Sequence, residues 1–127
     1  LRVMALPFKL FVGGKLGSGQ QGVSWVHLDD AVAILMACVD EESISGKVNV
    51  TSPNPVSNAE VSTAIANAVH RPSWLAAPSF ALKALFGEGA APILTGQYAV
   101  PGVLLKRGFA FGHACLSEAV RQSLDAS

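Results

Sequence analysis

Charged residues are scarce in this sequence. They make up 14% of its 127 residues, whereas roughly 25% is usual for a soluble domain. Nine basic and nine acidic residues are scattered along the chain and give a net charge of zero. Nucleic-acid binding depends on clustered Lys and Arg side chains that neutralise phosphates, so this composition disfavours it. We expect no nucleic-acid partner.

Long apolar runs are also absent. A membrane-spanning helix needs about 18 to 20 consecutive apolar residues, and the run 31–39 is too short and is bounded by acidic residues. No signal peptide is visible. The only cysteines, Cys38 and Cys115, are typical of unpaired thiols in a reducing compartment. We therefore expect a cytoplasmic protein with no membrane partner.

Apolar residues, in contrast, are abundant. They make up 50% of the chain, which is more than elements of this total length are expected to cover. We therefore expect an exposed apolar face that normally meets another part of a larger protein. The first residue, Leu1, is not methionine, which also favours a fragment.

Short extended segments alternate with helical ones along the chain, which predicts an α/β fold. Val and Trp residues favour strands at 23–28 and 47–51, and Pro53 and Pro55 end the second because proline cannot donate to a strand ladder. Shorter strands are expected at 74–77 and 109–111, the second with both phenylalanine rings on one face.

A capping box marks the clearest helix. Ser57 and Glu60 have the spacing that satisfies reciprocal backbone donors, and an apolar stripe with helical spacing follows them. A second helix is expected from Asp29 or Asp30, as N-cap, to about Val39, buried on more than one side because it is apolar nearly all round. Four further helices are expected. The first is a helix tail over 1–8, interrupted by Pro7 and followed by extended residues 9–12. The second covers 79–86, with Ser79 as cap and Gly87 as stop, and the third is a short helix from Pro101 to Gly108. The final helix is lined by Leu116, Val120 and Leu124.

The run 17–30 contains most of the residue types that could take part in catalysis or bind a metal. Ser24 and His27 are three positions apart on an expected strand, so they point to opposite faces and do not form a nucleophile and base pair. His27 and Asp29 could share a face for a metal, but no spaced third ligand is evident. The simpler interpretation is structural, with Trp25 in the core, His27 hydrogen-bonded to a neighbouring backbone group, and the aspartates capping a helix.

The same run, together with three later segments, resembles a known enzyme family. The sequence Ser24-Trp25-Val26-His27-Leu28-Asp29-Asp30 is followed by 46–60, by His70-Arg71-Pro72 and by 108–111 in the order and spacing found there. The resemblance is to the C-terminal portion of extended or atypical short-chain dehydrogenases/reductases, the NAD(P)-dependent nucleotide-sugar-epimerase-like branch, with its C-terminal domain of unknown function. It covers the chain from Leu1 to about Leu124.

This resemblance implies a Rossmann-type enzyme from which the cofactor-binding half is absent here. Members bind NAD(P) through an N-terminal glycine-rich turn and use a tyrosine and a lysine four positions apart. Here the only tyrosine, Tyr98, is followed four positions on by Gly102, and the glycines at 13, 14, 17 and 19 do not open directly into an amphipathic helix. We therefore expect neither catalytic nor cofactor-binding residues in this chain, with residues 1–56 ending the Rossmann-like region and 57–127 forming a small C-terminal α/β subdomain.

The resemblance also implies where a substrate would bind. The segment before the first expected strand lines the cleft for a sugar-nucleotide-like substrate, so the substrate-facing residues would be Gln20, Gln21, Ser24 and Trp25, with 13–19 as a mobile flap. A glycine turn can cradle phosphate but is more often only a turn. The family's diphosphate-binding arginines have no counterpart in this loop, and Arg71 and Arg107 are better explained as structural, which argues against a nucleotide diphosphate.

Two functions are consistent with these patterns. The chain is either the substrate-binding C-terminal region of an NAD(P)-dependent epimerase, dehydratase or reductase-like protein, inactive without its N-terminal cofactor domain, or a stand-alone binding or assembly module. In the second case it would cover its apolar face by self-association.

Overall fold

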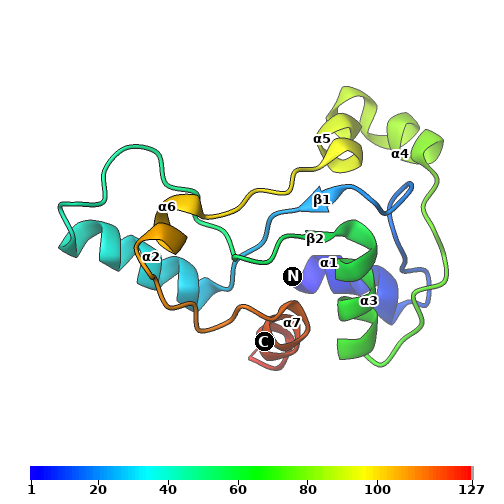
Figure 1. Ribbon diagram of the computed structural model, residues 1–127. Helices are drawn as coiled ribbons and strands as arrows, with labels where there is room; N and C mark the ends of the chain where they lie inside the picture. Colours follow the sequence, from blue (N-terminus) through cyan, green and yellow to red (C-terminus); the bar gives the residue numbers. More distant parts are fainter. Residues whose placement is uncertain (127) are drawn as a thin grey trace.

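The computed structural model describes residues 1–126 and contains short helices around one small sheet (Figure 1). In chain order the elements are α1 (Arg2–Lys9), β1 (Gly22–Val23), α2 (Leu28–Asp40), β2 (Val56–Ser57), α3 (Asn58–Ala68), α4 (Ser79–Phe86), the 3-10 turn η1 (Gly87–Gly89), α5 (Ala90–Thr95), α6 (Gly102–Lys106) and α7 (Leu116–Asp125). Figure 1 shows α2 and α6 at one end of the molecule, α4 and α5 at the other, and α7 at the bottom between them, with long irregular segments joining the two ends.

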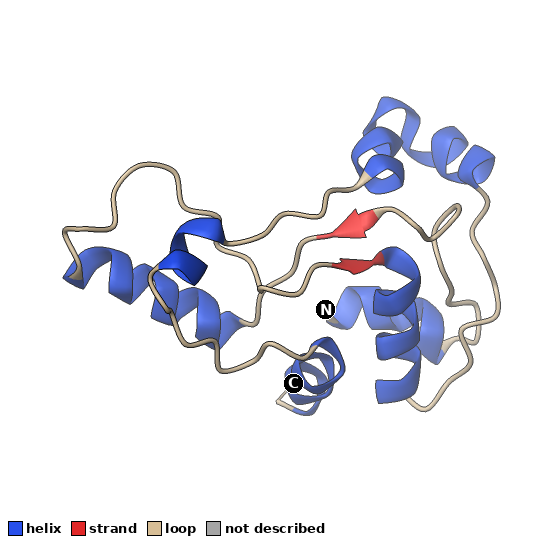
Figure 2. Ribbon diagram, in the orientation of Figure 1, coloured by secondary structure: helices blue, strands red, loops and turns tan. Residues whose placement is uncertain are grey.

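The sheet is smaller than the sequence predicts. Strand β1 pairs antiparallel with β2, Gly22 opposite Ser57 and Val23 opposite Val56, and these are the two strands in red in Figure 2. The strands predicted over 23–28 and 47–51 are therefore wrong as assigned, because among the described residues no neighbouring strand completes their ladders. The Ser52 N–H, just after the second segment, donates to the carbonyl of Trp25 in the middle of the first at 2.6 Å.

The two shorter strands were also predicted wrongly. Residues 74–77 form only an isolated parallel bridge between Leu16 and Ala77. Residues 109–111 form a loop in which the Phe109 and Phe111 rings meet edge to face, with centroids 5.0 Å apart.

The packed core lies between α1, α3 and α7. The capping box is confirmed, because the Ser57 hydroxyl accepts from the Glu60 N–H while the Glu60 carboxylate accepts from the Ser57 N–H at 2.7 Å. Of the predicted stripe, Val61, Ala64 and Ile65 are buried, Ile65 at 1% exposure. Ala68 and Val69 at its C-terminal end are half-buried. The core cluster comprises Ala5, Phe8, Val61, Ala64, Ile65, Ala66 and Val120, flanked by Leu116 and Leu124, so the final helix is also confirmed.

Helix α1 continues through Pro7 and does not lead into an extended segment. The Pro7 carbonyl accepts from the Val12 N–H at 2.9 Å, and Phe11 has a left-handed φ of 61°. The expectation of extended residues 9–12 is therefore wrong, because these residues form the turn that ends the helix.

Helix α2 has an expected position and an unexpected environment. Its N-cap is His27, whose Nδ1 accepts from the Asp29 N–H at 3.2 Å, so Asp29 and Asp30 lie within the first turn and are not the N-cap. Burial on more than one side is also wrong, since among its described residues only Asp30 and Ile34 are buried. The expected exposed apolar face is present, and α2 contributes Leu28, Val32, Leu35, Met36 and Val39 to it.

Helices α4 and α6 lie where the sequence predicts helices, whereas η1 and α5 between them were not predicted. Helix α4 has Pro78, not Ser79, as its N-cap residue, and Gly87 ends it with φ 55°. Pro101 is the N-cap of α6, and Gly108 follows that helix with φ 71°. The left-handed φ at both glycines explains why each helix stops there.

Candidate functional site

Ser24 joins β1 to the segment that follows α5. Its side-chain oxygen donates to the Gln97 carbonyl and accepts from the Ala99 N–H, both at 3.1 Å. Both of these partners belong to the backbone of the later segment. The Ser24 hydroxyl therefore positions that segment, and both of its hydrogen bonds go to this backbone and not to the His27 imidazole.

Gln21 is 7% exposed, and its side chain contacts the glycine-rich segment at Leu16. Its Nε2 donates to the Leu16 carbonyl at 2.9 Å and to the Ile93 carbonyl at 3.2 Å. Exchanging the amide N and O atoms would set an oxygen against two carbonyls, so the contacts fix the orientation. The Oε1 atom is buried without a hydrogen-bond partner.

Gln20 and Trp25 lie on either side of this pair. Gln20 is exposed, and its carbonyl accepts from the Tyr98 hydroxyl at 2.7 Å. Trp25 is half-buried, and its indole Nε1 donates to the Asn54 carbonyl at 2.8 Å. The indole ring is thus neither enclosed in the core, as the structural interpretation expected, nor among the residues that face the groove described next.

An open groove of about 830 Å³ runs between α1, β1 and α5. Its walls include Met4, Ser24, Ile93, Thr95 and Gln97. Within residues 1–126, none of the side chains that line it is ionisable. Of the four residues predicted to face substrate, the structure brings Ser24 to this groove, whereas Gln20, Gln21 and Trp25 are not among its lining residues.

The polar groove residues that the sequence did not identify include Asn58, Thr95 and Gln97. They come from α3, from α5 and from the loop after α5. Asn58 lies within the capping box, but that motif concerns the start of a helix and does not indicate a groove. These residues are far from Ser24 in sequence, and only the three-dimensional structure shows that they line the same groove.

The glycine-rich segment is hydrogen-bonded to the rest of the chain. The Leu16 N–H donates to Asn58 Oδ1 at 2.7 Å, and the Gly17 N–H donates to the Ala77 carbonyl at 2.8 Å. The Gly19 N–H donates to the Leu16 carbonyl at 3.1 Å. These three donors are therefore not available to a phosphate. At Gly14 a Cβ would collide with the Leu75 carbonyl, so this glycine is needed for close packing.

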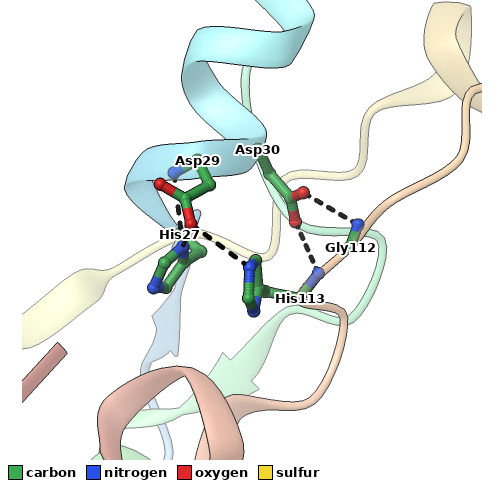
Figure 3. A network of polar contacts seen from close by, with 5 residues as sticks. All are labelled: His27, Asp29, Asp30, Gly112 and His113. Atoms are coloured by element: carbon green, nitrogen blue, oxygen red, sulfur yellow. Dashed lines mark hydrogen bonds and ion pairs between the residues drawn. The ribbon is translucent and has the colours of Figure 1, made fainter. Parts of the chain in front are cut away.

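A second group of polar residues lies at the N-terminus of α2 (Figure 3). Asp29 Oδ2 is 3.7 Å from His27 Nδ1 and 3.5 Å from His113 Nε2, and the two imidazole centroids are 3.9 Å apart. Within the described chain these three residues could hold a metal ion, because one ligand atom from each lies within 4.8 Å of the other two. His27 was considered in sequence, but nothing there indicated that His113 would join it.

Asp30 fixes the loop that carries His113. Its carboxylate is 4% exposed and accepts from the Gly112 N–H at 2.8 Å and from the His113 N–H at 2.9 Å. A carboxylate at a helix N-terminus is also favoured by the helix dipole. Asp30 therefore couples the start of α2 to the segment before α7.

The two arginines considered for diphosphate binding have other contacts. The Arg71 guanidinium lies 4.7 Å from the centre of the Phe11 ring. Arg107 donates to Ser43 through both its Nη atoms. Neither residue lines the groove.

Cys115 precedes α7 and is exposed, whereas Cys38 is half-buried in α2; both are unpaired thiols. Hydrogen bonds from the Ser117 hydroxyl and the Glu118 backbone lower the pKa of the Cys115 thiol. Among the described residues no helix is long and apolar enough to cross a membrane.

Comparison with known proteins places this chain among longer relatives. The model for "Domain of unknown function (DUF1731)" matches residues 77–123. The chain is 44% identical over 119 residues to the chloroplastic epimerase family protein SDR39U1 homolog of Arabidopsis thaliana, covering 93% of this chain and 34% of that protein. It is 40% identical over 122 residues to the epimerase family protein YfhF of Bacillus subtilis, covering 96% of this chain and 40% of that protein. The chain thus spans between a third and two fifths of the length of these curated relatives.

Two solved structures share its fold. The human epimerase family protein SDR39U1 with NADPH superposes with a TM-score of 0.90 at 30% identity, covering 99% of this chain and 43% of that one. A nucleoside-diphosphate sugar epimerase from Corynebacterium glutamicum has a TM-score of 0.69 at 28% identity, covering 96% of this chain and 23% of that one. In sequence and in fold, this chain corresponds to the C-terminal part of extended short-chain dehydrogenase/reductase proteins of the SDR39U1-like epimerase family.

Proposed function

We propose that this chain is the substrate-binding C-terminal region of an NAD(P)-dependent epimerase, dehydratase or reductase-like protein and is not catalytic by itself. The observation that carries the proposal is the open groove beside Ser24, in a fold that matches 43% of a protein solved with NADPH. In that role, an upstream domain supplies the cofactor and the acid/base groups, and the groove holds the substrate against them.

The exposed apolar face of α2 supports an upstream partner domain. Val32 is 52% exposed, Leu35 58% and Val39 77%, although α2 has the composition of a buried helix. Residues 47–51 likewise read as a strand and lack a strand partner within the described chain. A domain that packs on α2 and pairs with 47–51 would satisfy both elements.

The lining of the groove favours an uncharged substrate moiety. A diphosphate is normally held by arginine or lysine, and within the described residues the groove offers amide, hydroxyl and aliphatic groups instead. The Gln97 side-chain amide, with the Ser24 and Thr95 hydroxyl oxygens as acceptors because their O–H groups already donate to backbone carbonyls, would orient polar atoms of the substrate. Met4 and Ile93 would contact its apolar part.

Joining the chain to the upstream portion of YfhF tests the cofactor part of this proposal. We expect NADPH to bind the joined protein and not the 127-residue chain alone, as measured by the fluorescence of the nicotinamide. Tight NADPH binding by the isolated chain would overturn the assignment, because the cofactor site would then lie within these residues.

The groove is tested in the joined protein with two probes, the uncharged N-phenyl-1-naphthylamine and UDP-glucose. We expect the uncharged probe to bind and Gln97→Ala to weaken it, with the exposed Gln122→Ala in α7 as the matched control. Binding of UDP-glucose alone, or equal effects of the two substitutions, would contradict an uncharged site at this groove.

The exposed face of α2 also supports the alternative function, a module that self-associates. If the chain self-associates, analytical ultracentrifugation is expected to show a dimer or larger oligomer. The double variant Leu35→Glu, Val39→Glu is then expected to be a monomer. Copurification of the isolated chain with the upstream portion of YfhF, lost in the same double variant, would instead assign the face to the partner domain.

A further inference from the structure

The side chains of His27, Asp29 and His113 meet at the N-terminus of α2, and none of the three lines the substrate groove. His27 directly precedes α2, Asp29 lies in its first turn, and His113 comes from the loop before α7. Figure 3 shows the Asp29 carboxylate next to both imidazole rings. Two imidazoles and one carboxylate from distant parts of the chain thus converge on one point.

From this convergence we propose that His27, Asp29 and His113 bind a divalent transition-metal ion of the Zn²⁺ type. Ligand atoms about 2.0–2.1 Å from zinc in tetrahedral geometry lie about 3.3 Å apart. Asp29 Oδ2 is 3.5 Å from His113 Nε2 and 3.7 Å from His27 Nδ1, close to that spacing. One ligand atom from each of the three residues lies within 4.8 Å of the other two, so rotation of the two imidazoles would close the remaining difference.

The chemistry of the three groups selects the class of metal. Imidazole nitrogen suits zinc and its first-row neighbours, whereas calcium and magnesium require shells of oxygen ligands. The side chains of His27 and His113 are 10% and 20% exposed, and that of Asp29 is 74% exposed. The imidazoles are therefore shielded while the carboxylate side is open, which leaves room for water to complete the coordination.

Asp30 pre-positions the third ligand. Its buried carboxylate accepts from the backbone N–H groups of Gly112 and His113, so the loop is fixed against α2 before any ion binds. Outer-shell contacts that orient ligands in this way are a regular part of metal sites. The two neighbouring carboxylates also offset the positive end of the helix dipole, which by itself would repel a cation.

One existing contact competes with the metal. The His27 Nδ1 accepts from the Asp29 N–H, and its single lone pair cannot serve both. This N–H···N distance of 3.2 Å is at the long end for a hydrogen bond. Coordination through Nδ1 would replace this bond, so the ion would take over from His27 the task of fixing the start of α2.

The ion would act as a clamp between α2 and the segment before α7, and it takes no part in the chemistry proposed for the groove. The two proposals can therefore fail independently. An absent metal site leaves cofactor and probe binding in the joined protein unaffected, and a chain that binds metal tightly need not bind any substrate.

Zinc titration in a reducing buffer with a competing chromophoric chelator tests the site, both in the chain and in the protein joined to the upstream portion of YfhF. We expect one equivalent to bind, and His113→Ala and the conservative Asp29→Asn each to weaken binding at least about tenfold. His70→Asn is the control, since His70 lies elsewhere, has a left-handed φ of 53°, and asparagine tolerates that conformation. Circular dichroism without metal establishes that each variant is folded.

Cobalt substitution provides a second readout that does not depend on affinity. The spectrum is expected to show nitrogen and oxygen ligands without a thiolate charge-transfer band. No binding, equal affinity in all variants, loss in His70→Asn alone, or a thiolate band from Cys38 or Cys115 would each overturn the proposal.

Discussion

The core around α3 and the helix α2 differ in how they use apolar residues. The core formed by α1, α3 and α7 encloses Ile65 at 1% exposure, whereas α2 leaves Leu35 at 58% and Val39 at 77%. Yet α2 is the more apolar of the two helices in sequence. An apolar helix therefore indicates that a partner surface is needed, and it does not show that the same chain supplies it.

The largest difference between the two regions is expected from matched truncations. Ile65→Ala leaves a cavity in a closed core and is expected to lower the free energy of unfolding by about 2–5 kcal/mol. Leu35→Ala shortens a side chain that is 58% exposed and is expected to change the free energy of unfolding by less than about 0.5 kcal/mol. Urea unfolding of the two variants measures both values. A large loss for Leu35→Ala would mean that α2 is covered in the isolated chain, for example by a second copy.

A smaller effect is expected at the start of α3. Ser57→Ala removes the side-chain acceptor of the capping box and is expected to cost about 1 kcal/mol of stability. Thr63→Ala in the same helix is the control, because its hydroxyl donates only to the Ala59 carbonyl within the helix. The same urea titration compares them, and equal losses would show that the cap does not define the N-terminus of α3.

The capping box also predicts a pH dependence. The Ser57 backbone N–H, and then its hydroxyl, lower the pKa of Glu60 below its ordinary value of 4.5. Because the folded-state pKa is the lower one, this contribution is fully present above about pH 4.5 and is lost as the pH falls through the folded value. Glu60→Gln is expected to flatten the acid limb of a stability profile between neutral pH and pH values below 4.5. An unchanged acid limb would contradict the assignment.

The smallest effect is chemical and leaves the fold unchanged. Cys115 is exposed and its thiol pKa is lowered, whereas Cys38 is half-buried in α2. Iodoacetamide is expected to alkylate Cys115 at least about threefold faster than Cys38, because the thiolate is the reacting form. Peptide mass spectrometry follows both sites, and Ser117→Ala is expected to slow Cys115 alone. Faster labelling of Cys38 would indicate that α2 opens readily.

The sequence predicted those features that depend only on residues close together along the chain. The capping box at Ser57 and Glu60, the stop at Gly87 and the stripe through Leu116 and Val120 depend on neighbours within a helical turn or two, and the structure has them in place. The N-cap of α2 was misassigned by a few residues, since an imidazole nitrogen of His27 does what a carboxylate was expected to do.

Non-local features could not be predicted in the same way. Residues 47–51 have the composition of a strand, but a strand also needs a partner, and within the described residues none pairs with them. The groove around Ser24 and the meeting of His27 with His113 join segments that no spacing rule connects. The roles of Gln20, Gln21, Ser24 and Trp25 in substrate binding, and the division of the chain at residue 56, stay predictions.

The bond between Asp30 and the loop before α7 sets an order of events during synthesis. The Asp30 carboxylate accepts from Gly112 and His113, which lie 82 and 83 positions further along the chain. At roughly 5–20 residues per second, a ribosome needs about 4–16 s to deliver these partners after it has made the start of α2. During that interval the apolar face of α2 is unanchored, and any upstream domain would already have been made. A nascent chain therefore has its first opportunity to cover this helix from the N-terminal side, before its own C-terminal segment arrives.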